Sequence, residues 1–477
     1  MVNQLDVAPR PSPAQVIRPR RWFLAIATAA CTGIVLVSTR TAGPAIMVAL
    51  ILLATVGSIE LSRREANAPG DPRPIAWTIS GLYALAVAMP TRFPTDIWSF
   101  TMVGRILTVH HLNPYRVSPA RLGPDPMLHL LRHTWRSGTT PYGPLFVVHS
   151  AFVALVSGEH PLLYRLAFQI SAAAAVSIAL WLIWRETHST AALALVGLNP
   201  MIAGSIINGA HNDAMVALGL LGVVLLLKHK RIGTAGWVLC ATVLLKISIG
   251  FAMLPLALWT ATRFGKRGLA YFFAPVLVVA VPIMLFVPGA LHSMTNANEG
   301  VITRLTIWNI PLRVERLGYT DIDPIRLAKW GLLLVGVLCV FGAIIARRQP
   351  DAGRGAAIGA AAWLVGAAYV LAWYTVLGLV VAALHPTDRL ARWLAVQGGV
   401  ITAAFLLPRD WLAYPYVGHA VMFWIPVALA IGFVWALIPL VRDAFRLRRE
   451  ALGQAQSGGP DGGDMPTHDG GPQLVAE

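Results

Sequence analysis

The segment at residues 91–115, TRFPTDIWSFTMVGRILTVHHLNPY, is the part of the sequence from which the rest is interpreted. It follows an apolar run and contains Asp96, the first acidic residue after that run. Apolar side chains recur on one stripe over residues 95–110, a pattern typical of a helix that lies in a membrane interface. Asn113-Pro114 ends the pattern, because a residue before proline disfavours the helical conformation. The segment therefore predicts a carboxylate at a membrane surface, beside an interfacial helix.

The composition indicates a polytopic α-helical membrane protein. The 477 residues are 56% hydrophobic and 13% charged, whereas soluble domains carry about 25% charged residues. Apolar runs of about 17 residues or more, long enough to cross a bilayer as helices, recur throughout residues 22–441. They lack the alternation of a membrane β-barrel. We expect an all-α bundle of about 12–14 transmembrane helices, with both chain ends inside the cell.

The net charge of +16 does not indicate nucleic-acid binding, because the basic residues lie in short clusters between apolar runs. Such clusters orient membrane proteins with their positive loops inside. We therefore expect residues 1–21 to be a cytoplasmic tail and residues 22–441 to form the membrane domain. Two main outer loops are expected at residues 91–141 and 288–324, and a disordered cytoplasmic tail at residues 442–477,.

A polar cluster lies at membrane depth later in the chain: His211, Asn212 and Asp213. It follows an apolar stretch at residues 191–208 that is broken by Asn199-Pro200. The basic cluster at residues 228–231 is expected inside, which places the polar cluster outside if the broken stretch dips into the membrane and returns. The cluster would then lie on the same side as Asp96.

Asp96 and the polar cluster each allow two interpretations. Asp96 either complements the dipole of the helix that it precedes or acts as a general base. In the cluster, Asn212 or Asp213 either caps the next helix, or the cluster binds sugar hydroxyls, orients Asp96 or holds a metal ion. Ionisable residues at membrane depth are costly and point to function. The set of possible metal ligands is small.

Other candidate binding residues are basic or aromatic. Lys246, within an apolar hairpin at residues 232–260, either extends to the interface or faces a phosphate, and Arg304 could also bind phosphate. Tyr142 opens the apolar run after the first outer loop, where Pro-rich sequence also suits a simple helix start. Four further residues either bind sugar or a lipid, or belong to interfacial aromatic belts: Trp308, Asn309, Trp373 and Tyr374.

The order of these features resembles a known superfamily. Along the chain they are Asp96 after an early apolar run, Asn-Pro-Tyr at 113–115, Tyr-Gly-Pro-Leu at 142–145, Asn-Gly-Ala-His-Asn-Asp at 208–213, and Lys246 in a hairpin. This resembles the GT-C superfamily of integral-membrane glycosyltransferases. It is most similar to the polyprenol-phosphate-mannose-dependent mannosyltransferases of bacterial envelope glycolipids and lipoglycans.

The resemblance implies that a hexose, namely mannose, is transferred with inversion from a polyprenyl-phosphate donor to a glycolipid or lipoglycan acceptor. The active site would face the outer side of a bacterial plasma membrane, among membrane lipids. Asp96 would be the general base, residues 211–213 would bind substrate and Lys246 would contact the donor phosphate. Many relatives carry a second acidic residue after the first, whereas Ile97 follows Asp96 here. We therefore expect neither a metal ion nor another cofactor.

Two alternatives remain. One is a GT-C arabinosyl- or glucosyltransferase, which differs in its donor. The other is a transporter or flippase for a lipid-linked sugar, which would need no general base. The lack of a visible internal repeat counts modestly against transporter folds built from repeats.

Overall fold

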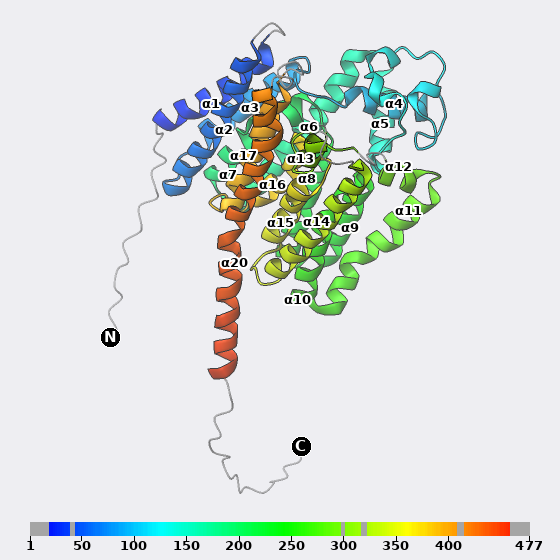
Figure 1. The fold of residues 1–477 in the computed structure, drawn as a ribbon. Coiled ribbons are helices and arrows are strands. Elements are labelled where there is room, and N and C mark those ends of the chain that lie inside the picture. Colours follow the sequence, from blue (N-terminus) through cyan, green and yellow to red (C-terminus); the bar gives the residue numbers. More distant parts are fainter. Residues whose placement is uncertain (1–18, 39–42, 297–300, 316–321, 408–414, 458–477) are drawn as a thin grey trace, which may run out of the picture.

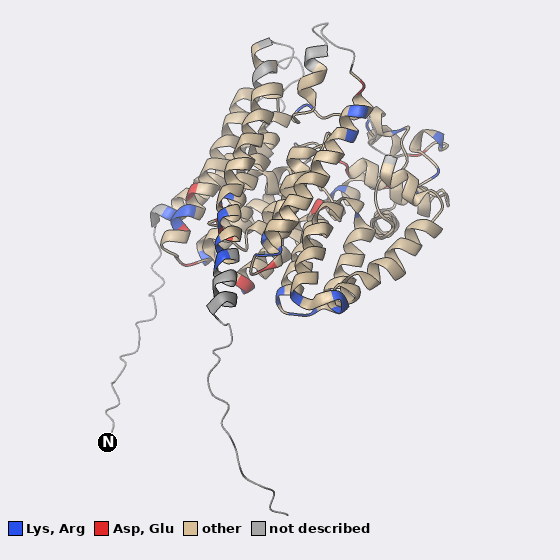
Figure 2. Cartoon of the chain, turned by 60° about the horizontal axis from the view of Figure 1, so that its bottom comes forward, with Lys and Arg blue, Asp and Glu red and all other residues tan. Residues whose placement is uncertain are grey.

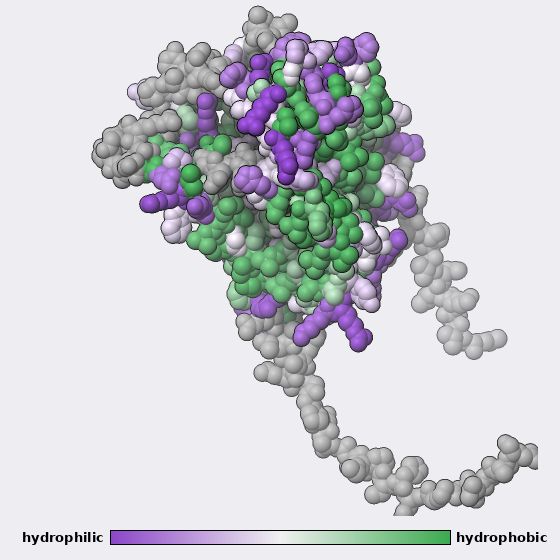
Figure 3. Space-filling model, turned by 90° about the vertical axis from the view of Figure 1, so that its right-hand side faces the viewer, coloured by the Kyte–Doolittle hydropathy of each residue, from purple (hydrophilic) through white to green (hydrophobic). Residues whose placement is uncertain are grey.

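The computed structural model describes residues 19–38, 43–296, 301–315, 322–407 and 415–457 (Figure 1). Within these ranges every regular element is a helix and no strand occurs, which confirms the predicted all-α class. Apolar side chains cover much of the outer surface of the bundle (Figure 3). An apolar outer surface is expected of a protein surrounded by lipid. The helices also satisfy their own backbone polar groups, which a lipid environment requires.

The N-terminal part of the chain forms three packed helices and then a partly irregular segment at residues 91–141, which we call the outer segment after its predicted side of the membrane. The helices before this segment are α1 (Pro19–Val37), α2 (Pro44–Asn67) and α3 (Arg73–Ala88). The segment contains α4 (Ile97–Thr108) and three short turns, η1 (Pro119–Arg121), η2 (Leu128–Leu130) and η3 (His133–Trp135). Two long helices follow, α5 (Pro144–Ser157) and α6 (Pro161–Thr187). Helix α4 begins within the predicted interfacial stretch and packs on α5.

The middle of the chain contains the broken stretch and the first hairpin. Its elements are α7 (Thr190–Gly197), the π-helical turn η4 (Ile202–Asn208), α8 (Asp213–Lys228), α9 (Ile232–Leu245), η5 (Ile247–Ile249) and α10 (Gly250–Pro275). The predicted break at Asn199-Pro200 is confirmed, because α7 and η4 are bent by 61°. The predicted hairpin is also confirmed, with Lys246 in the turn between α9 and η5.

The C-terminal part completes the bundle. Its elements are η6 (Val276–Ala280), α11 (Val281–Phe286), α12 (Ala290–Asn296), α13 (Asn309–Glu315), α14 (Pro324–Ala346), α15 (Ala352–Gly366), η7 (Ala372–Tyr374), α16 (Thr375–Ala382), α17 (Arg389–Phe405), α19 (Pro415–His419), η8 (Ala420–Trp424) and α20 (Ile425–Ser457). Helix α20 continues to Ser457, beyond the predicted end of the membrane domain at residue 441. The amphiphilic charge pattern there, in RDAFRLRRE, suits a helix leaving the membrane,. Residues 1–18 and 458–477 of the expected tails lie outside the described residues.

Several helices are long and apolar enough to cross a membrane. Five stretches meet this condition, and the bent pair of α7 and η4 makes a sixth if it is one span. The five are Pro44–Asn67, Pro161–Thr187, Ile247–Phe286, Pro324–Ala346 and Tyr416–Leu447. Four more apolar helices have 10–17 residues, and the predicted count of about 12–14 crossings included runs as short as these. Charged side chains lie mainly at helix ends and in connecting segments (Figure 2).

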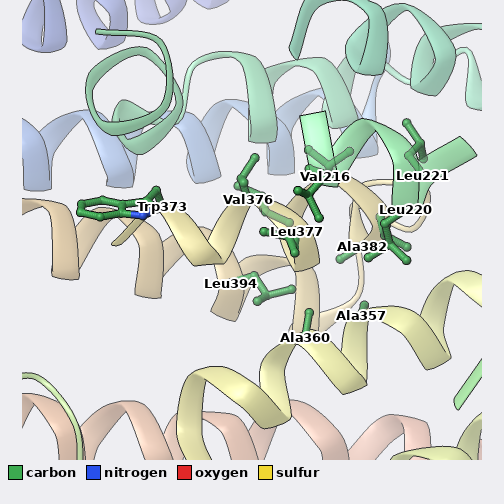
Figure 4. Close-up of a cluster of buried hydrophobic side chains, with 14 of the residues drawn as sticks. Val216, Leu220, Leu221, Ala357, Ala360, Trp373, Val376, Leu377, Ala382 and Leu394 are labelled. Atoms are coloured by element: carbon green, nitrogen blue, oxygen red, sulfur yellow. The ribbon is translucent and has the colours of Figure 1, made fainter. Parts of the chain in front are cut away.

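The core of the bundle surrounds α16. Every residue of this helix is buried, and a helix that is apolar on all sides belongs in a protein interior. Side chains of α8, α15, α16 and α17 pack together there (Figure 4). Trp373 lies in η7, directly before this buried helix, and is held in place because α16 packs against three other helices, α8, α15 and α17.

A buried ion pair ties the outer segment to α4. The Nε of Arg105 donates to both carboxylate oxygens of Asp125, at 3.0 and 2.9 Å, and its Nη1 donates to the carbonyl of Gly158 at 3.0 Å. The two side chains are 3% and 0% exposed. His110 Nε2 lies 2.8 Å from the same carboxylate. Removal of one partner of such a pair leaves an uncompensated buried charge.

We predict that Asp125→Asn lowers the free energy of unfolding by about 3–5 kcal/mol, because Arg105 then remains buried without its counter-charge. Thermal denaturation in detergent measures this change. Asp443→Asn is the matched control, since Asp443 pairs with Arg446 on the exposed face of α20 and such pairs contribute less than about 1 kcal/mol. Equal melting temperatures for the two variants would contradict the prediction.

Candidate active site

The segment that carries Asp96 is fixed by one buried side chain, Asn208. Its Nδ2 donates to the carbonyl oxygens of Ala86 at 3.0 Å and of Pro90 at 3.1 Å, and its Oδ1 accepts from the backbone N–H of Arg92 at 2.7 Å. The Thr95 hydroxyl adds a bond to the carbonyl of Gly209 at 2.9 Å. The end of η4 therefore holds the backbone between α3 and α4 on both sides of residue 92.

Asp96 does not use its carboxylate to cap α4. It occupies the N-cap position, but its side chain makes no capping hydrogen bond, and the N–H of Ile97 is bonded to Thr95 Oγ1 at 3.1 Å. The carboxylate instead accepts a hydrogen bond from the Tyr142 hydroxyl at 3.2 Å. It is 15% exposed, and its Oδ2 lies 3.9 Å from His211 Nε2.

Burial raises the pKa of the Asp96 carboxyl above its ordinary value. The positive charge of Lys246, the hydrogen bond from Tyr142 and the charge of Arg132 each act in the opposite direction, but their sum is smaller. A carboxylate with a raised pKa is a better proton acceptor than one in water. The environment therefore suits a general base, while also allowing the group to titrate closer to neutral pH.

Lys246 and Asp213 form a buried ion pair. Lys246 Nζ donates to both oxygens of Asp213 at 2.9 Å, and the Asp213 side chain is fully buried. The ammonium also lies 4.7 Å from the centre of the Tyr374 ring and 6.0 Å from that of Tyr142, within range of cation–π attraction. Lys246 is thus held in the protein interior and does not extend to the interface.

A close backbone contact brings Tyr142 to Lys246. The N–H of Gly143 donates to the carbonyl of Leu245 at 3.0 Å. A Cβ at position 143 would lie 2.0 Å from the carbonyl oxygen of Leu244, so only glycine permits this approach,. The Tyr-Gly-Pro-Leu motif therefore does more than begin α5, because its glycine joins the first outer segment to the turn of the α9–α10 hairpin.

His211 is buried between η4 and Trp373. Its Nδ1 lies 2.6 Å from the carbonyl oxygen of Ser205, and its ring is stacked on Trp373 at 3.6 Å with an interplanar angle of 17°. Asn212 is the N-cap residue of α8, but its side chain forms no capping bond. Asp213 lies in the first turn of that helix, where the helix dipole favours a negative charge.

Some of these groups line a cavity of about 770 Å³. Five of the predicted site residues line it: Asp96, Tyr142, Lys246, Trp373 and Tyr374. One wall is apolar and is formed by α10 and α14, with Phe251, Leu254, Leu332 and Val335. The cavity volume lies within the range of small-molecule sites.

Several lining residues were missed by the sequence reasoning. They include Trp135, Ser248, Lys329, Trp363 and Tyr369. Tyr369 lies five residues before Tyr374 in the irregular link before η7, so the polar and aromatic break within that apolar run was a usable signal. Lys329 gave a weaker signal, as a cation in the second turn of the mostly apolar helix α14, three residues after Arg326.

The other six predicted site residues are not among those that line the cavity: His211, Asn212, Asp213, Arg304, Trp308 and Asn309. Trp308 Nε1 donates to the carbonyl of Gly366 at 2.6 Å, and Asn309 Nδ2 donates to the carbonyl of Arg304 at 3.3 Å. These bonds connect α13 and its preceding segment to the end of α15. A role in binding remains a prediction for these residues.

Among the residues that the structure describes, no group of three or more His, Cys, Asp or Glu side chains is arranged to hold a metal ion. Asp96, His211 and Asp213 are near one another, but Asp213 is already neutralised by Lys246. Metal independence therefore stays a prediction.

Comparison with known proteins gives one family. The model of the family described as alpha-(1->6)-mannopyranosyltransferase, N-terminal domain, matches residues 10–263. An alpha-(1->6)-mannopyranosyltransferase A of Corynebacterium glutamicum is 29% identical over 259 residues, 50% of this chain and 51% of that protein. The Mycobacterium tuberculosis protein of the same name is 27% identical over 233 residues, 47% and 44% of the two chains. The match thus spans about half the length of these relatives, and it includes all of the site up to Lys246.

We predict that Asn208→Leu lowers the free energy of unfolding by about 1–3 kcal/mol, because the N–H of Arg92 and the carbonyls at the end of α3 lose their buried partner. Thermal denaturation in detergent measures the effect. Asn309→Leu removes one long hydrogen bond at a partly exposed position and serves as the control. The prediction fails if the two substitutions have the same effect.

Proposed function

This chain belongs to the alpha-(1->6)-mannopyranosyltransferase family, whose N-terminal-domain model matches more than half of its 477 residues, and we propose that it transfers mannose from a polyprenyl-phosphate donor to a glycolipid or lipoglycan acceptor. Membership confirms the resemblance to GT-C mannosyltransferases. The observation that carries the proposal is the Asp96 carboxylate in a cavity that also contains Lys246 and an apolar wall.

The proposed chemistry is a single inverting displacement. Asp96 removes the proton from the acceptor hydroxyl as the oxygen forms a bond to the anomeric carbon of mannose. The bond from that carbon to the phosphate oxygen breaks, and its electron pair leaves with the polyprenyl phosphate. A base on the face of the sugar opposite to the leaving group is the arrangement of inverting sugar transfer.

Lys246 supports departure of the phosphate. A phosphate leaving group gains negative charge as the bond breaks, and fixed positive charge and hydrogen-bond donors stabilise that charge in a site that excludes water. Lys246 Nζ is oriented by Asp213, and the hydroxyls of Tyr369 and Tyr374 also border the cavity. Because Asp213 offsets the charge of Lys246, Lys329 on α14 would supply the additional positive charge for a phosphate.

The apolar wall supports a lipid-linked donor. Leu254 of α10 and Leu332 of α14 both line the cavity and belong to helices apolar enough to span a membrane. A polyprenyl chain buries best against such a surface, because apolar area removed from water is stabilising. A water-soluble nucleotide sugar would gain nothing from it.

Charge distribution supports an active site on the outer side. Helix α10 turns sharply at Gly265, with φ 66°, between the basic residues Arg263 and Lys266. This bend lies at the opposite end of the bundle from α4 (Figure 1). Basic loops favour the cytoplasm, so the Asp96 segment would face outwards.

Asp96→Asn tests the assignment. We expect it to lower transfer from radiolabelled polyprenyl-phosphate mannose by about 10²–10⁴-fold, the usual contribution of a general base, while the melting temperature changes little. The assay measures mannose transfer by the protein in nanodiscs supplied with an envelope glycolipid extract, and Asp443→Asn, on α20 away from the cavity, is the control.

Retention of full transfer by Asp96→Asn would remove Asp96 as the base. Movement of labelled lipid without a new glycosidic bond would favour a flippase. Transfer only from arabinose or glucose donors would favour the other GT-C activities.

The rate of mannose transfer should also fall as the pH is lowered. The base acts in its charged form, and burial raises the pKa of Asp96. The rate constant for transfer should therefore fall on acidification at a pH above the ordinary value for an aspartate. Single-turnover rates across pH, measured with bound donor, test this. If the decrease in the transfer rate is centred at or below the pKa of a free aspartate, the buried environment described for Asp96 is contradicted.

A further inference from the structure

We propose that His211 accepts the proton that Asp96 takes from the acceptor hydroxyl, so that the base is returned to its charged form within the closed site. This inference rests on the mannosyltransferase function proposed above. It assigns to His211 a role that acts through Asp96 and not by contact with the sugar.

The hydrogen bonding of His211 fixes which nitrogen can accept a proton. A carbonyl oxygen only accepts hydrogen bonds, so the 2.6 Å contact between Nδ1 and the Ser205 carbonyl places a proton on Nδ1,. In the neutral ring Nε2 then carries a free lone pair. His211 is 1% exposed, and its Nε2 is buried without a hydrogen-bond partner.

The free nitrogen faces the candidate base. His211 Nε2 lies 3.9 Å from Asp96 Oδ2, which also accepts the Tyr142 hydroxyl. A buried acceptor with no partner is costly, and such a group in a native structure calls for an explanation. A protonated Asp96 would provide the missing donor, because a small movement of the carboxyl brings its O–H within hydrogen-bond distance of Nε2.

Burial lowers the pKa of His211 to about 4, while the charge of Asp213 acts in the opposite direction. The resting ring is therefore neutral, with Nε2 free to accept a proton. Asp213 is already paired with Lys246, so the Asp96 carboxylate is the group that an imidazolium at His211 would pair with. The Trp373 ring, stacked on the imidazole at 3.6 Å, attracts a cation through its π face. The other titratable groups that line the cavity are the cation Lys329, the thiol of Cys339 and three phenols, which are uncharged at neutral pH: Tyr142, Tyr369 and Tyr374.

The proton transfers balance over the reaction. The acceptor O–H bond breaks and an Asp96 O–H bond forms while mannose leaves the phosphate. The Asp96 O–H bond then breaks as Nε2–H forms, which gives the carboxylate and an imidazolium with protons on both nitrogens. When the products leave, Nε2 gives this proton to the phosphate or to water, and the starting state returns.

Chemical rescue tests the role. His211→Ala should lower the multiple-turnover rate by about 10–100-fold, within the range of proton-transfer contributions, and added imidazole should restore part of it. Polyprenyl-phosphate mannose should raise the melting temperature of the variant by the same amount as that of the wild type. His149→Ala is the matched control, since His149 is a partly buried histidine of α5 that contacts Ser171 and not Asp96. The His149→Ala variant should keep the wild-type rate without added imidazole.

Two results would overturn the proposal. One is a folded His211→Ala variant with the wild-type rate. The other is a slow variant that imidazole does not accelerate and whose pH dependence is that of the wild type, which indicates a structural role alone. If His211→Ala does not fold, His211→Gln decides, because a glutamine side chain fills similar space but does not accept a full proton. A folded His211→Gln protein with the wild-type multiple-turnover rate excludes the relay. If the wild type transfers no mannose, or Asp96→Asn transfers normally, the proposed function itself has failed.

Discussion

The ion pair between Lys246 and Asp213 is the interaction on which the rest of the site depends. It joins the first turn of α8 to the turn between α9 and η5, with two donor contacts of 2.9 Å. Removing either group alone would leave an uncompensated charge in the interior, at a cost of about 3–5 kcal/mol. The pair therefore fixes one side of the cavity. Tyr142 and Tyr374 are placed against the same ammonium by its attraction to their rings.

The opposite side of the cavity is fixed by the π-helical turn η4. A π-helical turn is rare and occurs mostly at functional sites. Here its last residue, Asn208, bonds to the backbone at the end of α3 and in the α3–α4 connection. A Cβ at Gly209 would lie 2.7 Å from the carbonyl oxygen of Pro94, so the two segments can approach only because this residue is glycine. Asp96 is thereby positioned by backbone contacts, which frees its carboxylate for chemistry.

The sequence was sufficient for the fold class and for several of the residues that line the cavity. Lys246, Tyr142 and Asp96 could be predicted because each is a polar group beside an apolar run, where polarity is costly. Their pairing could not be predicted. Asp213 lies 33 residues from Lys246, and only the packing of α8 against α9 brings them together. The same limit explains the omission of Tyr369 and Lys329, which reach the cavity from elements distant in sequence.

Aromatic residues show that a sequence signal can also select residues that lie outside the cavity. Trp308 and Trp373 both gave the signal of an aromatic beside an outer loop, but only Trp373 lines the cavity. Trp308 uses its N–H to hold the carbonyl of Gly366. Nothing in the local sequence separates these two uses, because each depends on the partner that the fold provides.

The central claim is that the donor's anomeric carbon lies between Asp96 and Lys246. The most direct measurement is a cryo-electron microscopy structure with a non-cleavable polyprenyl phosphonate analogue of the mannose donor. The account predicts the phosphonate beside Lys246, the sugar against Trp373 with its anomeric carbon facing Asp96, and the lipid chain along α10 and α14. An analogue bound elsewhere, or with its sugar turned away from Asp96, would contradict it.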